Sequence, residues 1–260
     1  MKKYLVIGNP IDHSLSPKLH NHWIKKNNID AVYDKKQLNE IDIEGIISEV
    51  KDGKIDGINV TVPFKKSVIP FLDGLTSLAK DAQSVNTIYK KNNKVTGDNT
   101  DIGGFEQGLK HINYNVKNKK IFILGAGGVT SSIIIALKKL RPAQITLSNR
   151  TKIKAENLKK IYSDLEIIEW GETPDFDMII NTTSLGLKNN EQIKLNYDEI
   201  GPNKLFYDVI YNPKKTNFLL KAQQFGNKIE NGQMMFIYQA QLAFKIWHNI
   251  LPKVENKLLD

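Results

Sequence analysis

The stretch KKIFILGAGGVTSSIIIALKKL, residues 119–140, constrains the fold more than any other part of the sequence. Its apolar run IFIL predicts a strand, and residues 128–139 predict a helix that begins as soon as the glycines end. Gly125, Gly127 and Gly128 would let the backbone approach a pyrophosphate, whose charge would then lie at the start of the helix. Because a strand precedes the glycines and a helix follows, we expect a dinucleotide-binding site here; a purely structural turn is the alternative.

The second strand of this unit indicates which dinucleotide binds. Residues 144–148 predict a strand, and Asn149, Arg150 and Thr151 follow it. Domains that prefer NAD usually carry an acidic residue in this region, which accepts from the ribose 2′-hydroxyl. An acidic group would repel a 2′-phosphate, whereas the guanidinium of Arg150 can bind it with two hydrogen bonds, and Lys154 lies behind. We therefore expect NADPH rather than NADH, unless Arg150 stands there by chance.

Strands and helices alternate along the chain, which favours mostly parallel sheets covered by helices. Composition changes near residues 101–104, so we expect two α/β domains; periodicity does not say which of them holds the last helix. The predicted strands span residues 3–8, 31–38, 55–62, 85–90, 94–98, 120–124, 144–148, 165–169, 177–181 and 205–210. The predicted helices begin at residue 16 and run over 43–50, 101–111, 128–139, 152–162 and 232–250.

Two serines lie where the chain enters its first predicted helix. In the motif HSLSP, Ser16-Pro17 predicts a helix start with Ser16 as the N-cap. Hydroxyl groups beside the free N–H groups of a helix start can bind a small anion such as a carboxylate. Ordinary capping by Ser16 would leave Ser14 unexplained, so this stretch alone leaves both interpretations open.

The segment NVTVPFKK, residues 59–66, places a lysine where an apolar strand stops. Pro63 fixes one φ angle, so Lys65 would leave a stiff and extended base. A solvated strand end is the ordinary explanation for such a lysine, and this segment alone favours it. Lys66 would point the other way if the strand continued, and we assign it no role.

A predicted hairpin places further polar side chains together. Its turn would be Asn92-Asn93, and it would return GDNTD, residues 97–101, beside SVNT, residues 84–87. Asn86 and Asp101 would then converge, and an amide with a carboxylate suits a polyol. Singly, each of these residues is a common turn former.

Composition limits the possible partners. The net charge of +9 suggests nucleic acid, but only two of the 37 basic residues are arginine and the lysines are scattered, so we expect no nucleic-acid partner. No apolar stretch approaches the ~20 residues of a membrane span, and we expect no membrane partner. The chain has no cysteine, which excludes disulfides and fits a cytoplasmic protein. The five histidines form no pattern typical of a metal site.

Taken together, the motifs resemble those of one family. HSLSP, NVTVPFK, SVNT, GDNTD, GAGG, NRT, NTTSLG and GQMMFIYQA are distributed over nearly the whole chain and closely resemble shikimate dehydrogenase. The resemblance implies NADP-dependent, reversible reduction of 3-dehydroshikimate to shikimate in aromatic amino-acid biosynthesis. It implies a substrate-binding domain over residues 1–101, completed by 233–260, and a Rossmann-type NADP domain over 102–232. We expect the protein to be a monomer or a homodimer, and we expect it to bind the small-molecule substrate shikimate or 3-dehydroshikimate.

The resemblance also implies roles for single residues. Lys65 and Asp101 match the family's catalytic pair, and Ser14 and Ser16 match serines that bind the substrate carboxylate. The other implied substrate contacts are Thr61, Asn86, Tyr211 and Gln239. The implied cofactor contacts are Gly125, Ala126, Gly127, Gly128, Asn149, Arg150, Thr151, Lys154, Thr182, Val209 and Gly232. The chain departs from the family at Val129-Thr130, where smaller residues are usual.

Three other functions compete with this one. A quinate/shikimate dehydrogenase that uses NAD is the nearest, and the basic segment NRTKIK argues against it. Glutamyl-tRNA reductase has a similar cofactor domain but needs a cysteine nucleophile, which this chain lacks. A non-catalytic ligand sensor on the same scaffold would not need both Lys65 and Asp101.

Overall fold

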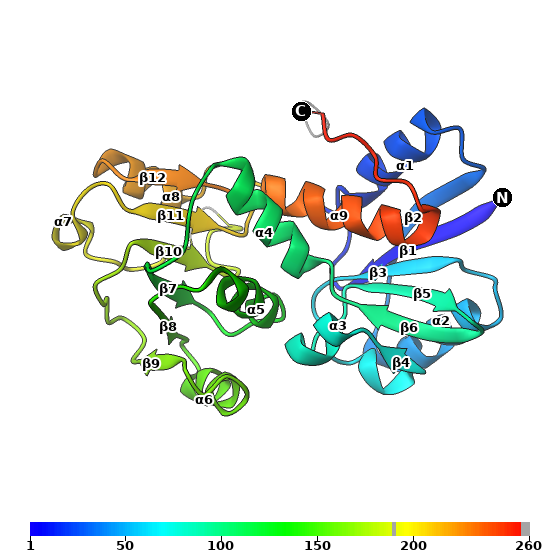
Figure 1. Cartoon of the computed structure of the whole chain (residues 1–260), viewed down its shortest axis with the longest axis horizontal. Helices are drawn as coiled ribbons and strands as arrows, with labels where there is room; N and C mark the ends of the chain where they lie inside the picture. The colour runs from blue at the N-terminus through cyan, green and yellow to red at the C-terminus, as the bar shows by residue number, and fades with distance from the viewer. Residues whose placement is uncertain (189–190, 256–260) are drawn as a thin grey trace. The chain divides into compact units, whose positions relative to one another are not determined.

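The computed structural model describes residues 1–188 and 191–255, which form two compact α/β units (Figure 1). The first unit contains Met1–Gly104 and Ile237–Asp260, and the second contains Phe105–Phe236. Two helices contain the points where the chain passes between the units, α4 (Asp101–His111) and α9 (Gln233–His248). Across the described residues, every helix is too short or too polar to cross a bilayer.

The first unit is built on a mixed six-stranded sheet with the order β2-β1-β3-β5-β6-β4. The pairs β1/β2, β1/β3 and β4/β6 are parallel, whereas β3/β5 and β5/β6 are antiparallel. The strands are β1 (Lys2–Gly8), β2 (Ala31–Gln37), β3 (Gly57–Val60), β4 (Gly74–Leu75), β5 (Thr87–Lys91) and β6 (Lys94–Asp98). The helices are α1 (Ser16–Lys26), α2 (Ile43–Lys51) and α3 (Ser77–Ala82), with short 3-10 turns at Glu40–Asp42 and Ile69–Phe71.

The two faces of this sheet bury different kinds of side chain. Aliphatic residues of α2 pack with those of β1, β3, β5 and β6 into one hydrophobic cluster. Rings from β1, β2, α1 and α9 pack together into a second group, which we call the aromatic cluster. Its members are Tyr4, His20, Trp23, Tyr33, Phe244, Trp247 and His248.

The second unit has a wholly parallel six-stranded sheet with the order β12-β11-β10-β7-β8-β9. Counted from β7, this is the doubly wound order 3-2-1-4-5-6 of dinucleotide-binding domains, with its switch point between β7 and β10. The strands are β7 (Lys120–Leu124), β8 (Gln144–Ser148), β9 (Glu166–Ile168), β10 (Met178–Asn181), β11 (Leu205–Asp208) and β12 (Lys228–Glu230). The helices that lie wholly within it are α5 (Thr130–Leu140), α6 (Lys152–Ile161), α7 (Tyr197–Ile200) and α8 (Asn217–Gln224).

The predicted α/β class is confirmed, and the differences from the predicted elements are local. The hairpin of β5 and β6 turns at Asn92 and Asn93, whose φ angles of 49° and 61° suit a tight two-residue turn. Helix α5 begins at Thr130, two residues later than expected. The short elements α3, α7, α8, β4 and β12 were not predicted, although Thr216 accepts from Leu219 N as a regular N-cap of α8.

Candidate active site

Lys65 lies in a turn and not on a strand. Strand β3 ends at Val60, and the chain then turns, with Phe64 N donating to Thr61 O and Val68 N to Phe64 O. The expectation of an extended, stiff base for Lys65 is therefore wrong; the turn directs its side chain into the unit instead. Lys65 is only 8% exposed, which is rare for lysine. Lys66 is exposed.

The ammonium of Lys65 meets a carboxylate on another element. Lys65 Nζ donates to Asp101 Oδ2 at 2.5 Å, and Asp101 is 5% exposed at the first residue of α4. Lys65 is held from its backbone as well, since its carbonyl accepts from Val85 N at 2.8 Å. A buried charge of either sign needs such a partner, because an unpaired one would lose its hydration without compensation.

Asn86 lies at the centre of the polar group around this ion pair. Its amide nitrogen donates to Asp101 Oδ1 and to Thr100 Oγ1, both at 2.9 Å, and lies 3.3 Å from Gln239 Oε1. Its amide oxygen accepts from Thr100 N at 2.7 Å. The predicted convergence of Asn86 with Asp101 is thus confirmed, and Gln239 of α9 joins them.

The two serines are connected to the same group through residues that the sequence did not single out. Ser16 forms a side-chain hydrogen bond with Tyr33, whose hydroxyl donates to Asn59 Oδ1 at 2.7 Å. The amide nitrogen of Asn59 donates in turn to the carbonyl of Asn86 at 3.0 Å. Burial raises the pKa of Tyr33 well above its ordinary value, so its hydroxyl is protonated. The signal for Asn59 was an amide in an otherwise apolar strand; Tyr33 gave none.

The start of α1 differs from the predicted N-cap. Leu15 occupies the cap position and Ser16 is the first helical residue, so Ser16 does not cap the helix. Ser14 Oγ instead accepts from Ser16 N at 3.3 Å. Thr61 lies close to Gly8, where an added Cβ would stand 2.5 Å from Thr61 Cγ2. The glycine at the end of β1 therefore leaves room for the threonine.

In the second unit, the glycine turn after β7 brings the backbone into close contact with the segment after β10. Gly125 has φ +107°, and a Cβ there would lie 2.7 Å from Thr183 Cγ2 and 2.8 Å from Thr182 Oγ1. Ala126 N donates to Asn149 Oδ1, and Gly127 N donates to Thr130 Oγ1, both at 3.0 Å. Gly128 follows in the turn that leads into α5. Thr130 thus provides an acceptor where smaller residues were expected.

The segment after β8 suits a phosphorylated ribose. Arg150, Thr151 and Lys154 are exposed, and residues 149–154 contain no carboxylate. Asn149 is held in place because its amide also donates to Thr151 O at 2.8 Å. These residues fit NADP: the glycine turn lies at the end of β7, and an exposed guanidinium group follows β8.

The remaining predicted residues of this unit lie in the segments that follow β10, β11 and β12. Thr182 is buried, and its hydroxyl donates to Leu124 O at 2.9 Å. Val209 N donates to Asn181 O at 3.0 Å. A Cβ on Gly232 would lie 2.1 Å from the Val209 carbonyl, so these two backbones are in close contact. Tyr211 stacks on Phe236, with ring centroids 4.5 Å apart.

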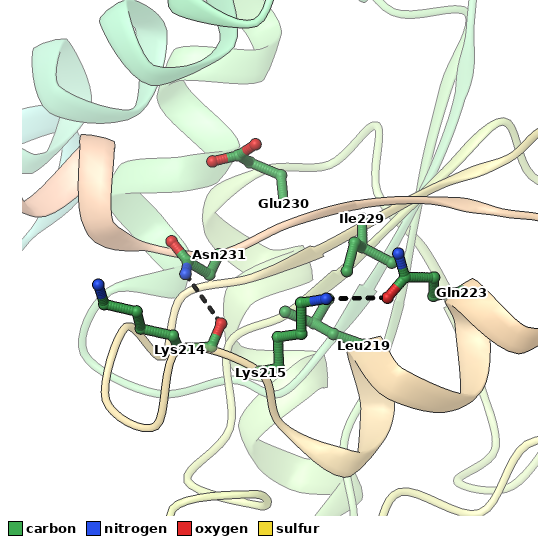
Figure 2. A pocket seen from close by; sticks show the side chains of 7 residues that line it. All are labelled: Lys214, Lys215, Leu219, Gln223, Ile229, Glu230 and Asn231. Carbon is green, nitrogen blue, oxygen red and sulfur yellow. Dashed lines mark hydrogen bonds between the residues drawn. The ribbon is translucent and has the colours of Figure 1, made fainter. Parts of the chain in front are cut away.

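A separate pocket in the second unit contains none of the predicted site residues (Figure 2). Lys215 Nζ donates to Gln223 Oε1 at 3.0 Å, and Asn231 Nδ2 donates to the Lys214 carbonyl at 2.9 Å. The side chains of Lys215, Gln223 and Asn231 are therefore engaged in the wall of this pocket, and we assign the pocket no role in the site.

The doubly wound sheet, its glycine turn and the buried Lys65–Asp101 pair define a nicotinamide-dependent dehydrogenase of the two-unit α/β type. Two family models match: "Shikimate dehydrogenase substrate binding domain" over residues 6–88 and "Shikimate / quinate 5-dehydrogenase" over residues 107–185. The shikimate dehydrogenase (NADP(+)) of Pelagibacter ubique (strain HTCC1062) is 60% identical over 259 residues, which cover 100% of this chain and 98% of that one. The chain belongs to the shikimate dehydrogenase family.

Solved structures agree with this assignment. The crystal structure of shikimate dehydrogenase from Aquifex aeolicus matches with a TM-score of 0.91 at 38% identity, covering 99% of this chain and 96% of that one. Shikimate 5-dehydrogenase from Thermus thermophilus, in complex with NADP(H) and shikimate, matches with a TM-score of 0.90 at 28% identity, covering 97% and 95%.

Proposed function

We propose that this chain catalyses the NADPH-dependent, reversible reduction of 3-dehydroshikimate to shikimate, with Lys65 and Asp101 as its catalytic pair. The first unit would bind the substrate and the second NADP. The observation that carries the proposal is the buried ion pair, with Nζ and Oδ2 2.5 Å apart, flanked by the amide of Asn86. A solvated strand end would not bury its lysine beside a carboxylate.

The reaction adds a hydride and a proton to a ketone, and the bound nicotinamide supplies the hydride. Negative charge develops on the ketone oxygen as its π bond breaks, and the ammonium of Lys65 stabilises that charge and donates the proton. Asp101 holds the ammonium in position and accepts a hydrogen bond from a ring hydroxyl. In the reverse direction, Lys65 takes the proton from the alcohol.

The rest of the site orients the ring. The hydroxyls of Ser14 and Ser16 bind the substrate carboxylate, while Thr61, Asn86 and Gln239 contact ring hydroxyls. Holding the substrate at both ends fixes which face of the carbonyl meets the cofactor, and orientation of this kind accounts for much of enzymatic rate enhancement. Tyr211 adds a further substrate contact.

The cofactor is held by backbone and by positive charge. Gly125, Ala126, Gly127 and Gly128 surround the pyrophosphate at the start of α5. Asn149, Arg150, Thr151 and Lys154 bind the adenosine 2′-phosphate. Thr182, Val209 and Gly232 contact the nicotinamide half.

The test is the variant Lys65→Ala, assayed with shikimate and NADP at the nicotinamide absorbance band. We expect kcat to fall by about 10²–10⁴-fold, the usual effect of removing a positioned acid/base group, with a smaller change in KM. Lys66→Ala is the matched control, because the neighbouring lysine is exposed and should keep wild-type turnover. Wild-type kcat in Lys65→Ala would refute the assignment, and tight shikimate binding without turnover in the wild type would favour a sensor.

We also propose a cytoplasmic enzyme that acts as a monomer or homodimer without nucleic-acid or membrane partners. The absence of cysteine and the scattered lysines support this. Light scattering after gel filtration gives the mass directly; a tetramer, or a mass that depends on added nucleic acid, would contradict it.

A further inference from the structure

Asp208 is a buried carboxylate of the second unit for which no role has been assigned so far. It is the last residue of β11 and has no exposed surface. In the sheet register, Asp208 pairs with Asn181 at the end of β10, which pairs with Leu124 at the end of β7. Adjacent strands lie about 4.8 Å apart, so Asp208 is about 10 Å from the residue that precedes the glycine turn.

Three neutral donors from three segments converge on this carboxylate. Asn181 Nδ2 and Ile210 N donate to Asp208 Oδ1, each at 3.0 Å. Thr216 Oγ1 donates to Asp208 Oδ2 at 2.6 Å. The three donors belong to the end of β10, to the chain just after β11, and to the N-cap of α8. Asp208 therefore ties together segments that span 36 positions of sequence.

The first of these segments, the end of β10, continues into a loop at the carboxyl edge of the sheet. Asn181 Oδ1 accepts from Thr183 N at 3.0 Å and Thr183 Oγ1 at 2.7 Å, and Asn181 Nδ2 also donates to Leu185 O at 3.1 Å. Gly186, with φ +111°, approaches so closely that a Cβ would lie 3.1 Å from Thr216 Cβ. The loop over residues 181–186 is thus fixed by the same group of side chains that Asp208 holds.

The chain after β11 is fixed in the same way. Ile210 N is bound to Asp208, and Ile210 O accepts from Gly232 N at 3.1 Å. Val209 lies between Asp208 and Ile210 in the chain, and its carbonyl is in close contact with Gly232. In parallel sheets of this type, ligands bind beyond the carboxyl ends of the strands at the switch point. Asp208 lies at that edge, one strand away from the switch point between β7 and β10.

We propose that Asp208 is a positioning residue of the cofactor site: it holds loop 181–186 and the chain around Val209 in the arrangement that binds the nicotinamide half of NADP. The inference rests on the proposed function, because it takes Thr182, Val209 and Gly232 as cofactor contacts. Asp208 itself would not touch the cofactor.

The position suits a carboxylate. Two oxygens accept three donors here, whereas an asparagine has one acceptor oxygen, and its NH2 group would force the Thr216 hydroxyl to reverse from donor to acceptor. Burial raises the pKa of Asp208 to about 6, against the opposing effect of its three hydrogen bonds. Burying a carboxylate is costly, and an apolar side chain would fill the same space without that cost. Packing alone therefore does not account for Asp208.

The experiment measures NADPH binding to the whole chain, without shikimate, by the fluorescence of the reduced nicotinamide. Asp208→Asn and Thr216→Val should each raise the Kd of NADPH about ten-fold or more, the effect of losing a hydrogen bond to a charged group. Thr216→Ser keeps the hydroxyl and should therefore bind NADPH with wild-type affinity. The double variant should lose less than the product of the two single effects, because both remove one shared bond. Shikimate Kd, measured by calorimetry, should stay within about two-fold.

Phe206→Leu is the matched control for a merely structural effect. Phe206 is buried on the same strand, two residues before Asp208, and packs in the core of the unit. It should lower the unfolding midpoint while NADPH Kd stays within about two-fold.

The outcomes separate the inference from the function. Wild-type NADPH affinity in Asp208→Asn and Thr216→Val, or an equal loss in Phe206→Leu at matched stability, would overturn the positioning role alone. If Asp208→Asn does not fold, the Kd of NADPH for Thr216→Val alone tests the positioning role. A wild-type chain that does not bind NADPH would refute the proposed function, and the positioning role with it.

Discussion

The aromatic cluster of the first unit buries a histidine that has no hydrogen-bond partner on either ring nitrogen among the residues that the structure describes. His20 is 1% exposed and stacks on Tyr33, with ring centroids 4.2 Å apart and planes 3° apart. Burial, and secondarily the nearby His248, lower the pKa of His20 from 6.5 to about 3. Its neutral form is therefore built into the folded structure, so the first unit should be sensitive to acid.

The sign and size of this effect follow from linkage. The unfolded chain protonates His20 below pH 6.5, but the folded chain does so only near pH 3. The contribution of neutral His20 to the free energy of unfolding is thus fully present above pH 6.5 and is lost as the pH falls toward 3. Each pKa unit corresponds to about 1.4 kcal/mol, so the full effect is about 5 kcal/mol. Between pH 7.5 and 5.0, the part due to His20 is about 2 kcal/mol.

His20→Phe should remove this part of the pH dependence and keep the stack. The measurement is urea unfolding at pH 7.5 and 5.0, followed by tryptophan fluorescence in a Trp170→Phe background. Trp23 and Trp247, which lie in the aromatic cluster, then report on the first unit. His248, whose pKa is lowered to about 4 mainly by burial, should supply the slope that remains.

His13→Gln is the matched control, because His13 is exposed on the same unit. It should leave the wild-type difference between the two pH values intact. If His20→Phe loses as much stability between pH 7.5 and 5.0 as the wild type does, the reasoning from burial is refuted.

Three further predictions concern single side chains. Arg150→Ala should lower kcat/KM for NADPH about 10–100-fold and change that for NADH little; unchanged efficiencies with both cofactors would exclude a 2′-phosphate contact. Tyr33→Phe should raise the calorimetric Kd of shikimate about ten-fold, since Asn59 loses a buried donor; an unaltered Kd would mean that the link to Ser16 is dispensable. Gly57→Ala should cost about 1–3 kcal/mol in urea unfolding, because its Cβ would lie 2.4 Å from Trp247 Nε1; wild-type stability would show that the indole moves freely.

Sequence reasoning succeeded where structure depends on neighbours in the chain. The glycine turn at Gly125 was predicted from glycines that stand between a strand and a helix, and the structure gives the physical reason: only a residue without Cβ suits both its positive φ and its close contact with Thr182. The hairpin turn at Asn92 was predicted for a similar reason, since asparagine tolerates the left-handed region. With that turn fixed, the meeting of Asn86 and Asp101 followed from strand pairing.

It failed where the hydrophobic pattern misled. Ile58, Val60 and Val62 alternate as in a single strand, so the strand was extended through Val62. In the structure Val62 is 60% exposed and belongs to the turn that carries Lys65. Apolar alternation cannot distinguish a strand from the turn that follows it, because both can place valine at every second position.

It also failed for residues that act through distant pairing. Tyr33 and Asn59 are 26 positions apart, and they meet because β2 and β3 both pair with β1. The register that places them together is a property of the whole sheet, and a sequence pattern gives no sign of it. Buried polar residues of a strand are therefore best assigned after the sheet order is known.

The two units bury a carboxylate in different ways, and the difference separates their roles. Asp101 is compensated by the ammonium of Lys65, whereas Asp208 is held by neutral donors. Removing Lys65 would leave Asp101 as an uncompensated buried charge, which is strongly destabilising. The loss of turnover in Lys65→Ala therefore combines a missing acid with a disturbed carboxylate. A cycle with Asp101→Asn divides the two: the amide needs no counter-charge, so the difference in kcat between Asp101→Asn and the double variant measures the loss of the acid without an unpaired buried carboxylate.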